Sequence, residues 1–181
     1  MQIRTKDLVY MALMVVLLVV CSWASITIGS IVPFTLQTFA VFCTMLLLGG
    51  WRGSFAIAVY ILMGAVGLPV FSGFRGGLGA LLGPTGGYIL GFLLTALLYW
   101  GFERAAGERV WAQLLLLVLG LALCYGFGTA WFIQVYGRSN PISVAGALGM
   151  CVLPYLPVDA VKLALAAVLC HRLKPALKLD S

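Results

Sequence analysis

The sequence predicts an all-α fold, a polytopic membrane protein whose 181 residues form a single membrane domain with six transmembrane helices. Two observations support this prediction. Hydrophobic residues make up 63% of the chain and charged residues 9%, whereas an average soluble domain has about 25% charged residues. The chain also contains long stretches without Asp, Glu, Lys or Arg. Each is long enough for one or two crossings of a bilayer at about 20 apolar residues per crossing.

The six helices follow from the positions at which charge, glycine and proline interrupt these stretches. The uncharged stretch 8–51 must hold two crossings, and the segment 29–33, with its glycine and proline, separates them. Pro154 and Pro157 interrupt the last helix. A glycine-rich loop, residues 68–84, joins the third helix to the fourth. The predicted helices span residues 7–28, 35–50, 53–67, 85–103, 109–137 and 143–172.

Charge placement predicts that both termini lie in the cytoplasm. Six spans put the two ends of the chain on one side, and basic residues are enriched in cytoplasmic loops. The opposite side would hold only Arg75 and Arg138. Membrane topology therefore accounts for the net charge of +6, and nucleic acid is not needed as a partner. The basic residues on the predicted cytoplasmic side are Arg4, Lys6, Arg52, Arg104, Arg109, Arg172, Lys174 and Lys178.

The cysteines and the histidine indicate neither a metal site nor a disulfide framework. The cysteines are odd in number, stand singly in apolar segments and lack metal-ligand spacing, so we interpret them as packing residues. His171 is the only histidine and follows the apolar part of the last helix, where one imidazole cannot form a metal or catalytic set. We predict no cofactor and no metal. The five cysteines are Cys21, Cys43, Cys124, Cys151 and Cys170.

Asp159 and Lys162 are the two charged residues that the hydropathy pattern places inside the membrane. A charge at the centre of a spanning helix costs about 2.5–3.5 kcal/mol, and such residues indicate a functional site by default. Spaced three apart, the two side chains lie on one helix face, which Tyr155 shares. They either form a structural ion pair between helices or bind a polar guest with amide-like donors and acceptors. Gln37, near the same membrane face, either bonds another helix or contacts that guest.

The loop between the third and fourth helices is the most unusual stretch, and we predict that it is a lid over a binding site. Loops this long without secondary structure tend to be lids or binding loops, and glycine lets backbone groups approach a ligand. It lacks the Gly-Lys-Ser/Thr of a Walker motif, since Gly83 is followed by Pro84 and Thr85, so no ATP site is recognisable. Thr85 or a neighbour could cap the fourth helix and leave N–H groups near an anionic ligand group.

Small residues also recur every fourth position across the end of this loop and the start of the fourth helix. For Gly87, Gly91 and Thr95, inside the helix, we favour a stripe that packs closely on a neighbouring helix. For Gly73 to Gly86, in the loop and at the helix start, we favour a role in the lid.

Four segments together resemble the BioY family, the biotin-specific S components of energy-coupling factor (ECF) transporters. They are Val-Pro-Phe-Thr-Leu-Gln at 32–37, Gly-Leu-Pro-Val-Phe at 67–71, Leu-Leu-Gly-Pro-Thr-Gly-Gly-Tyr at 81–88 and Leu-Pro-Val-Asp-Ala-Val-Lys at 156–162. The resemblance covers nearly the whole chain. It implies a six-helix S-component fold in a prokaryotic cell membrane, biotin capture from outside, and a pocket closed by the loop between helices three and four.

The resemblance also implies that the Asp159 and Lys162 positions contact biotin. The ureido ring has two N–H donors and a carbonyl acceptor, which suit a carboxylate and an ammonium, and its apolar remainder suits a hydrophobic cavity. The orientation of biotin stays open. The predicted binding residues are Asp159, Lys162, Gln37, Tyr88, Tyr155, Thr85 and Gly86, and the predicted lid residues are Phe71, Gly73, Arg75, Gly76 and Gly77.

An S component implies partners, namely a membrane coupling subunit and a pair of ATPases. S components often dock through small residues spaced four apart on helix one, but here the best match is Ala12 with Val16, which breaks that pattern. A stand-alone biotin transporter or facilitator therefore stays open. Two alternatives from other classes are an intramembrane enzyme that uses Asp159 as acid or base, and a structural scaffold. The enzyme alternative is weakened because the sequence places no second carboxylate within the membrane.

Overall fold

The structure is a computed structural model that describes residues 4–26, 32–107 and 109–177. Within these ranges the chain forms eight helices and one pair of two-residue strands. In chain order they are α1 (Thr5–Trp23), β1 (Ser25–Ile26), β2 (Phe34–Thr35), α2 (Gln37–Leu48), α3 (Gly50–Ala65), α4 (Leu78–Leu82), α5 (Gly86–Ala106), α6 (Val110–Tyr136), α7 (Val144–Cys151) and α8 (Leu156–Leu177).

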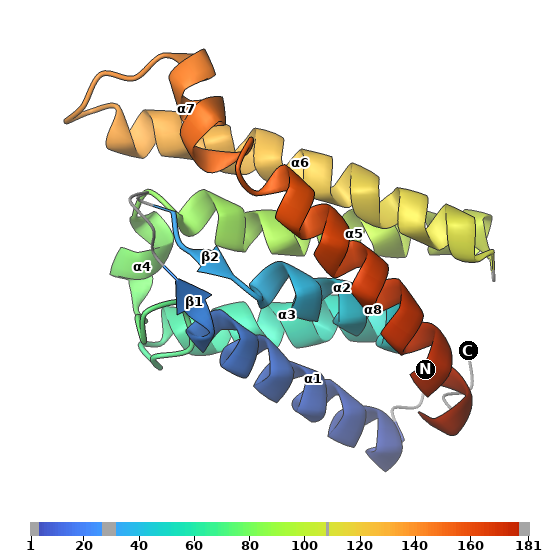
Figure 1. Cartoon of the computed structure of the whole chain (residues 1–181). Coiled ribbons are helices and arrows are strands. Elements are labelled where there is room, and N and C mark those ends of the chain that lie inside the picture. Colours follow the sequence, from blue (N-terminus) through green and yellow to red (C-terminus); the bar gives the residue numbers. More distant parts are fainter. Residues whose placement is uncertain (1–3, 27–31, 108, 178–181) are drawn as a thin grey trace.

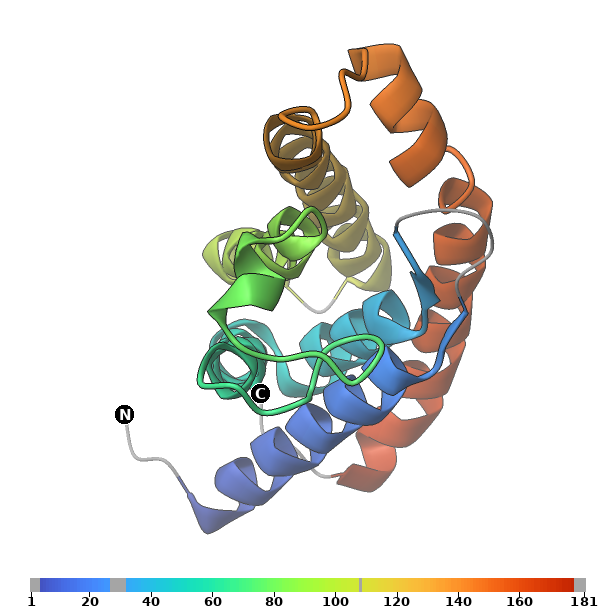
Figure 2. The same cartoon turned by 90° about the vertical axis from the view of Figure 1, so that its left-hand side faces the viewer.

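The bundle has two distinct ends. Figure 1 shows β1, β2, α4 and α7 gathered at one end, here called the loop end, and both termini at the other, here called the terminal end. Helix α2 forms the centre, where every residue from 40 to 48 is buried. Helices α1, α3, α5 and α8 pack around α2, whereas α6 packs mainly on α5. Figure 2 shows α6 and α8 on different sides of the bundle, with α7 linking them.

The structure supports a multi-pass membrane protein but does not establish six spans. Helices α1, α5 and α6 are long and apolar enough to cross a membrane, and the bent pair α7–α8 would be a fourth span. The 12 residues of α2 cover only about 18 Å at 1.5 Å per residue, against about 30 Å of hydrocarbon. Length and composition therefore do not decide whether α2 and the 16-residue α3 cross the membrane.

The predicted packing stripe on α5 is confirmed. A Cβ atom added at Gly87 would lie 2.3 Å from the Trp131 side chain of α6, and one at Gly91 would lie 2.6 Å from the Cys124 sulfur. The Thr95 hydroxyl donates to a backbone carbonyl of α6 at 2.8 Å. Small residues thus bring the two backbones into close contact, as in other membrane helix pairs.

The first predicted helix ends earlier than expected. Helix α1 ends at Trp23 and β1 follows, because Ser25 and Ile26 pair antiparallel with Thr35 and Phe34. The predicted end of that helix at 27–28, most of the separating segment 29–33, and Lys178 lie outside the described residues. The apolar pattern could not reveal this pairing, since two residues per strand carry no periodicity.

The last predicted helix is two helices. Helices α7 and α8 meet at an angle of 44° across a short turn. Pro154 lies in that turn and Pro157 in the first turn of α8, where its missing N–H would have no intrahelical partner. The loop 68–84, expected to lack secondary structure, contains α4 and an isolated antiparallel bridge between Phe71 and Arg75.

Two carboxylates hold the start of α3 against α1 and α5 at the terminal end. The Asp7 carboxylate of α1 pairs with the Arg52 guanidinium at 3.2 Å and also accepts from the Arg4 backbone N–H at 3.2 Å. The Glu103 carboxylate of α5 accepts from the Gly50 N–H at 2.8 Å. These bonds tie α1, α3 and α5 together and satisfy backbone donors that a helix start leaves without intrahelical partners.

Candidate binding site

A cavity of about 400 Å³ lies at the loop end, between α2, α5, α6, α8 and the loop 68–84. This volume is typical of a small-molecule site, for which pockets range over about 300–1,000 Å³. Its walls are mainly apolar and aromatic. The predicted site residues on its walls are Gln37, Phe71, Arg75, Gly76, Thr85, Tyr88, Tyr155, Asp159 and Lys162, whereas the predicted residues Gly73, Gly77 and Gly86 do not line it.

Lys162 is buried, with 7% of its surface exposed, and its ammonium has three partners. Nζ donates to Asp159 Oδ1 at 2.7 Å, to the Thr35 carbonyl at 2.7 Å and to the Thr38 hydroxyl at 3.0 Å. An ammonium has three hydrogens, so each has an acceptor within the protein. The lysine therefore fixes the end of β2 and the first turn of α2 against α8.

Asp159 is only 2% exposed and is held from three helices. Oδ1 accepts from Lys162 and from the Thr38 hydroxyl at 2.8 Å, and Oδ2 accepts from the Tyr125 hydroxyl of α6. A carboxylate has about four acceptor positions, so Oδ2 retains capacity for one more donor. Both interpretations of the pair thus have a basis in the structure, since it joins helices and also lines a cavity.

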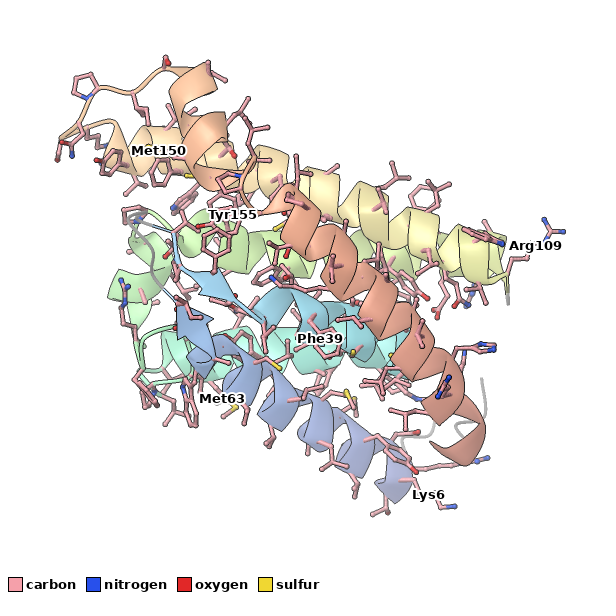
Figure 3. All side chains as sticks on the ribbon, viewed as in Figure 1. Lys6, Phe39, Met63, Arg109, Met150 and Tyr155 are labelled. Carbon is pink, nitrogen blue, oxygen red and sulfur yellow. The ribbon has the colours of Figure 1, made fainter. Side chains whose placement is uncertain are left out.

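Tyr155, just before α8, lines the cavity and also holds the first loop in position. Its ring stacks on Phe34 of β2 at a centroid distance of 4.2 Å and an interplanar angle of 17°. Its hydroxyl donates to the Val32 carbonyl. Figure 3 labels Tyr155 where α8 begins, beside the strand pair.

Gln37 and Tyr88 line the cavity while their polar groups bond other helices. The Gln37 side-chain amide donates to the Tyr60 hydroxyl of α3 at 2.8 Å, which favours the helix-to-helix interpretation of this residue. The Tyr88 hydroxyl lies 3.0 Å from that of Thr129 on α6. Thr85 occupies the N-cap position of α5, as predicted, but its side chain makes no capping hydrogen bond.

The lid loop is anchored at both ends by tryptophans. The Trp23 indole N–H donates to the Pro69 carbonyl at 2.8 Å, and that of Trp131 donates to the Gly83 carbonyl at 3.0 Å. Between these anchors the chain turns tightly, with positive φ at Gly73. These bonds give the loop a fixed course over the cavity, a role the sequence did not assign to either tryptophan.

Glycine at position 76 is required by a close backbone approach. A Cβ atom there would lie 2.1 Å from the Leu68 carbonyl oxygen, so any other residue would displace the loop. The next side chain towards the N-terminus, Arg75, is exposed yet lines the cavity. Among the described lining residues, Arg75 and Lys162 carry the basic charges.

Sequence reasoning missed Thr38 and Tyr125, which complete the polar network. Thr38 follows Gln37 directly, and its hydroxyl bonds both charged residues at once. Tyr125 lies in the middle of the most apolar predicted span. Its hydroxyl was the one feature in the sequence that could have marked it as a member of the site. A buried hydroxyl needs a partner, and the sequence offered few polar groups at that depth. Among the described residues, no group of three or more His, Cys, Asp or Glu could hold a metal ion.

The chain as a whole is similar to known proteins. The family model described as the BioY family matches residues 1–179. The chain belongs to the BioY family. The biotin transporter BioY of Thermotoga maritima is 37% identical over 169 residues, which cover 93% of this chain and 96% of that protein. The probable biotin transporter BioY of Pyrococcus horikoshii is 37% identical over 171 residues, covering 94% and 98%.

A solved structure agrees with the fold. The crystal structure of the S-component for biotin from an ECF-type ABC transporter superposes with a TM-score of 0.83 at 25% identity, covering 96% of this chain and 95% of that chain. The prediction of the S-component fold and of the family is therefore confirmed. Membership of a transporter family also supports the prediction that the chain is not an enzyme.

Proposed function

We propose that this chain is a substrate-binding membrane subunit that captures biotin from outside for uptake by an ATP-driven ECF transporter. The observation that carries the proposal is the buried Asp159–Lys162 pair on the wall of an otherwise largely apolar cavity of about 400 Å³. A bicyclic ligand with a ureido group and an aliphatic chain matches such a site, because it is mostly apolar with polar groups at its two ends.

The hydrogen bonds favour one orientation of biotin. Lys162 has no hydrogen left to donate, whereas Asp159 Oδ2 retains acceptor capacity, so the ureido N–H groups belong near Asp159. The valeryl carboxylate then belongs at the basic residue at the mouth, Arg75, where partial exposure keeps the cost of dehydrating both charges low.

The remaining predicted site residues divide into two roles. Phe71, with the loop glycines Gly73, Gly76 and Gly77, shapes the lid that closes over biotin. Gln37, Thr85, Gly86, Tyr88 and Tyr155 position the walls. In this arrangement Tyr155 and Gln37 act on biotin through the strand and helix that they hold.

We further propose six spans with both termini in the cytoplasm, in which α2 and α3 are two short crossings. The basic residues at the terminal end support this orientation, and Lys6 and Arg109 in Figure 3 illustrate their position. Single cysteines at positions 75 and 138 in a cysteine-free background are expected to react with impermeant reagents only from outside. Labelling from the cytoplasmic side alone would contradict this topology.

Energy for uptake is proposed to come from a membrane coupling subunit with a pair of ATPases. The chain has no recognisable nucleotide-binding motif, and the two charges predicted within the membrane, Asp159 and Lys162, are already assigned to the biotin site. The exposed face of α1, which includes Ala12 and the 58% exposed Val16, is the proposed docking surface. Its valine makes this contact looser than one between two small residues.

Two measurements test the proposal. Titration of purified full-length protein with biotin is expected to show saturable binding, and no binding by well-folded protein would overturn it. Liposomes that contain the chain alone are expected to bind or slowly equilibrate biotin. Accumulation above the external concentration without any ATPase would show a stand-alone transporter instead.

A further inference from the structure

A second cavity, of about 300 Å³, lies at the terminal end, away from the proposed biotin site. It lies between the last turn of α2, the first turns of α6 and the last turns of α8. On α8 the nearest lining residues of the two cavities, Lys162 and Ala167, are five residues apart, or about 7.5 Å at 1.5 Å per residue. None of the residues assigned to biotin lines this second cavity.

The walls of the second cavity combine two chemistries. Its interior is apolar, with Leu46 from α2, Leu114 from α6 and Ala167 from α8. Its rim carries two exposed nitrogen bases, His171 and Lys174. The cavity therefore matches a molecule that joins an anionic group to a hydrocarbon part.

The charge around the rim is cationic, since no described carboxylate lines the cavity. The described carboxylates at this end have other partners: Asp7 pairs with Arg52, and Glu103 accepts from Gly50. The amide of Gln113, which also lines the cavity, already donates to the Gly107 carbonyl at 3.0 Å. Lys174 and His171 are thus the groups that an occupant would meet.

The flanking helices present hydrocarbon to the membrane. In its most apolar window, only 17% of α6 is buried inside the bundle, so most of its surface faces lipid. On α8, Leu165 and Val168 are each 58% exposed. Acyl chains can therefore extend from the cavity along the two helices without leaving the bilayer.

We propose that the second cavity binds an anionic phospholipid, with its phosphate at Lys174 and His171 and its glycerol and upper acyl region against Leu46 and Leu114. Basic pockets between transmembrane helices on the cytoplasmic side are suited to lipid headgroups, and lysines near helix ends extend towards the interface. A soluble anion would gain nothing from the apolar walls. A peptide would bring backbone groups for which the cavity has few partners.

The test uses purified full-length protein and mixed micelles of phosphatidylglycerol and phosphatidylcholine. Native mass spectrometry is expected to show preferential retention of phosphatidylglycerol. Lys174→Gln is expected to lower that retention about fivefold, the effect of roughly one cationic contact. Arg104→Gln, which removes an equal charge at the same end but outside the cavity, is expected to leave it unchanged.

A second variant addresses the apolar half. Ala167→Phe keeps the charge and fills the cavity, so it is also expected to lower retention, with monodispersity and thermal unfolding as checks of folding. Equal retention of both lipids, or no difference between Lys174→Gln and Arg104→Gln, would overturn the proposal. Displacement of the lipid by inorganic phosphate at equal concentration would point to a soluble-anion site, and a retained peptide to a protein partner. Both would also overturn it. Lipid retention is independent of biotin, so failure here leaves the proposed function untouched.

Discussion

The two ends of the bundle each bury an ion pair, but the pairs are built differently. Asp159 and Lys162 lie three residues apart on one helix, so their mutual contact lies within α8 and does not by itself link two elements. Hydroxyls and a carbonyl from α2, β2 and α6 attach to it instead. Asp7 and Arg52 belong to different helices, and their own contact joins α1 to α3.

This difference indicates separate roles for the two ion pairs, one in ligand binding and the other in holding helices together. The pair at the loop end lines a cavity, where one carboxylate oxygen keeps acceptor capacity for a guest. The pair at the terminal end lines neither of the two cavities described above. We therefore expect changes at the first pair to act mainly on biotin affinity and changes at the second mainly on stability. The predictions below test this, in order of their expected effect on biotin affinity.

Asp159→Asn should cause the largest loss of affinity. The substitution keeps the shape but removes the charge that balances the Lys162 ammonium and that, in the proposed orientation, accepts from the ureido N–H groups. Breaking a buried, hydrogen-bonded charge pair costs about 2–5 kcal/mol, which is roughly 30-fold or more in Kd. Calorimetric titration with biotin would measure it, on protein shown to be monodisperse. Lys162→Ala should also weaken binding, with a larger loss of stability, because it also leaves the Thr35 carbonyl without this donor. Wild-type affinity in well-folded Asp159→Asn would remove Asp159 from the site.

Tyr125→Phe should have the next largest effect. It removes one hydroxyl, which donates to Asp159 from α6. A hydrogen bond to a charged group contributes about 1.5–3 kcal/mol, so we expect a loss of about tenfold or more in biotin affinity. Tyr136→Phe, on the same helix but outside the cavity, is the matched control. Equal affinities for the two variants would show that the α6 contact does not orient the carboxylate.

Arg75→Gln should have a smaller, salt-dependent effect. The side chain is exposed, so the proposed interaction with the biotin carboxylate would contribute at most about 1 kcal/mol, or up to about fivefold in Kd. The difference from the wild type should shrink as ionic strength rises. Titrations in low and high salt would measure it, with Arg138→Gln as a control that lies outside the cavity. A loss that does not depend on salt would argue against a charge contact.

The sequence predicted the charged pair and the lid because both leave strong local signals. An ionised residue in a long apolar stretch is costly, and a glycine-rich loop is rare, so each stands out without knowledge of the fold. Most of the predicted residues, including Asp159 and Arg75, do line one cavity.

What the sequence could not provide was the set of partners across helices. Thr38 contacts residues 121 and 124 positions away, and Tyr125 contacts one 34 positions away. No periodicity encodes such pairs. The strand pair and α4 were missed for a different reason, since elements of two and five residues are too short for a pattern to register.

Asp7→Asn should leave biotin affinity unchanged and lower stability. The substitution removes the charge that pairs with Arg52 but keeps an oxygen that can accept from the Arg4 N–H. Loss of this charge contact to the partly buried Arg52 guanidinium costs about 1–3 kcal/mol, which is roughly 2–10 °C in apparent Tm for a chain of this size. Thermal unfolding and biotin titration on the same preparation would measure both quantities. Lys6→Gln, an exposed charge beside Asp7, is the control, with neither quantity expected to change. If Asp7→Asn instead lowered affinity as Asp159→Asn does, the two ends would act as one unit. The assignment of biotin binding to one pair and of stability to the other would then be wrong. An unchanged Tm would show that the pair at the terminal end contributes little to holding α1 on α3.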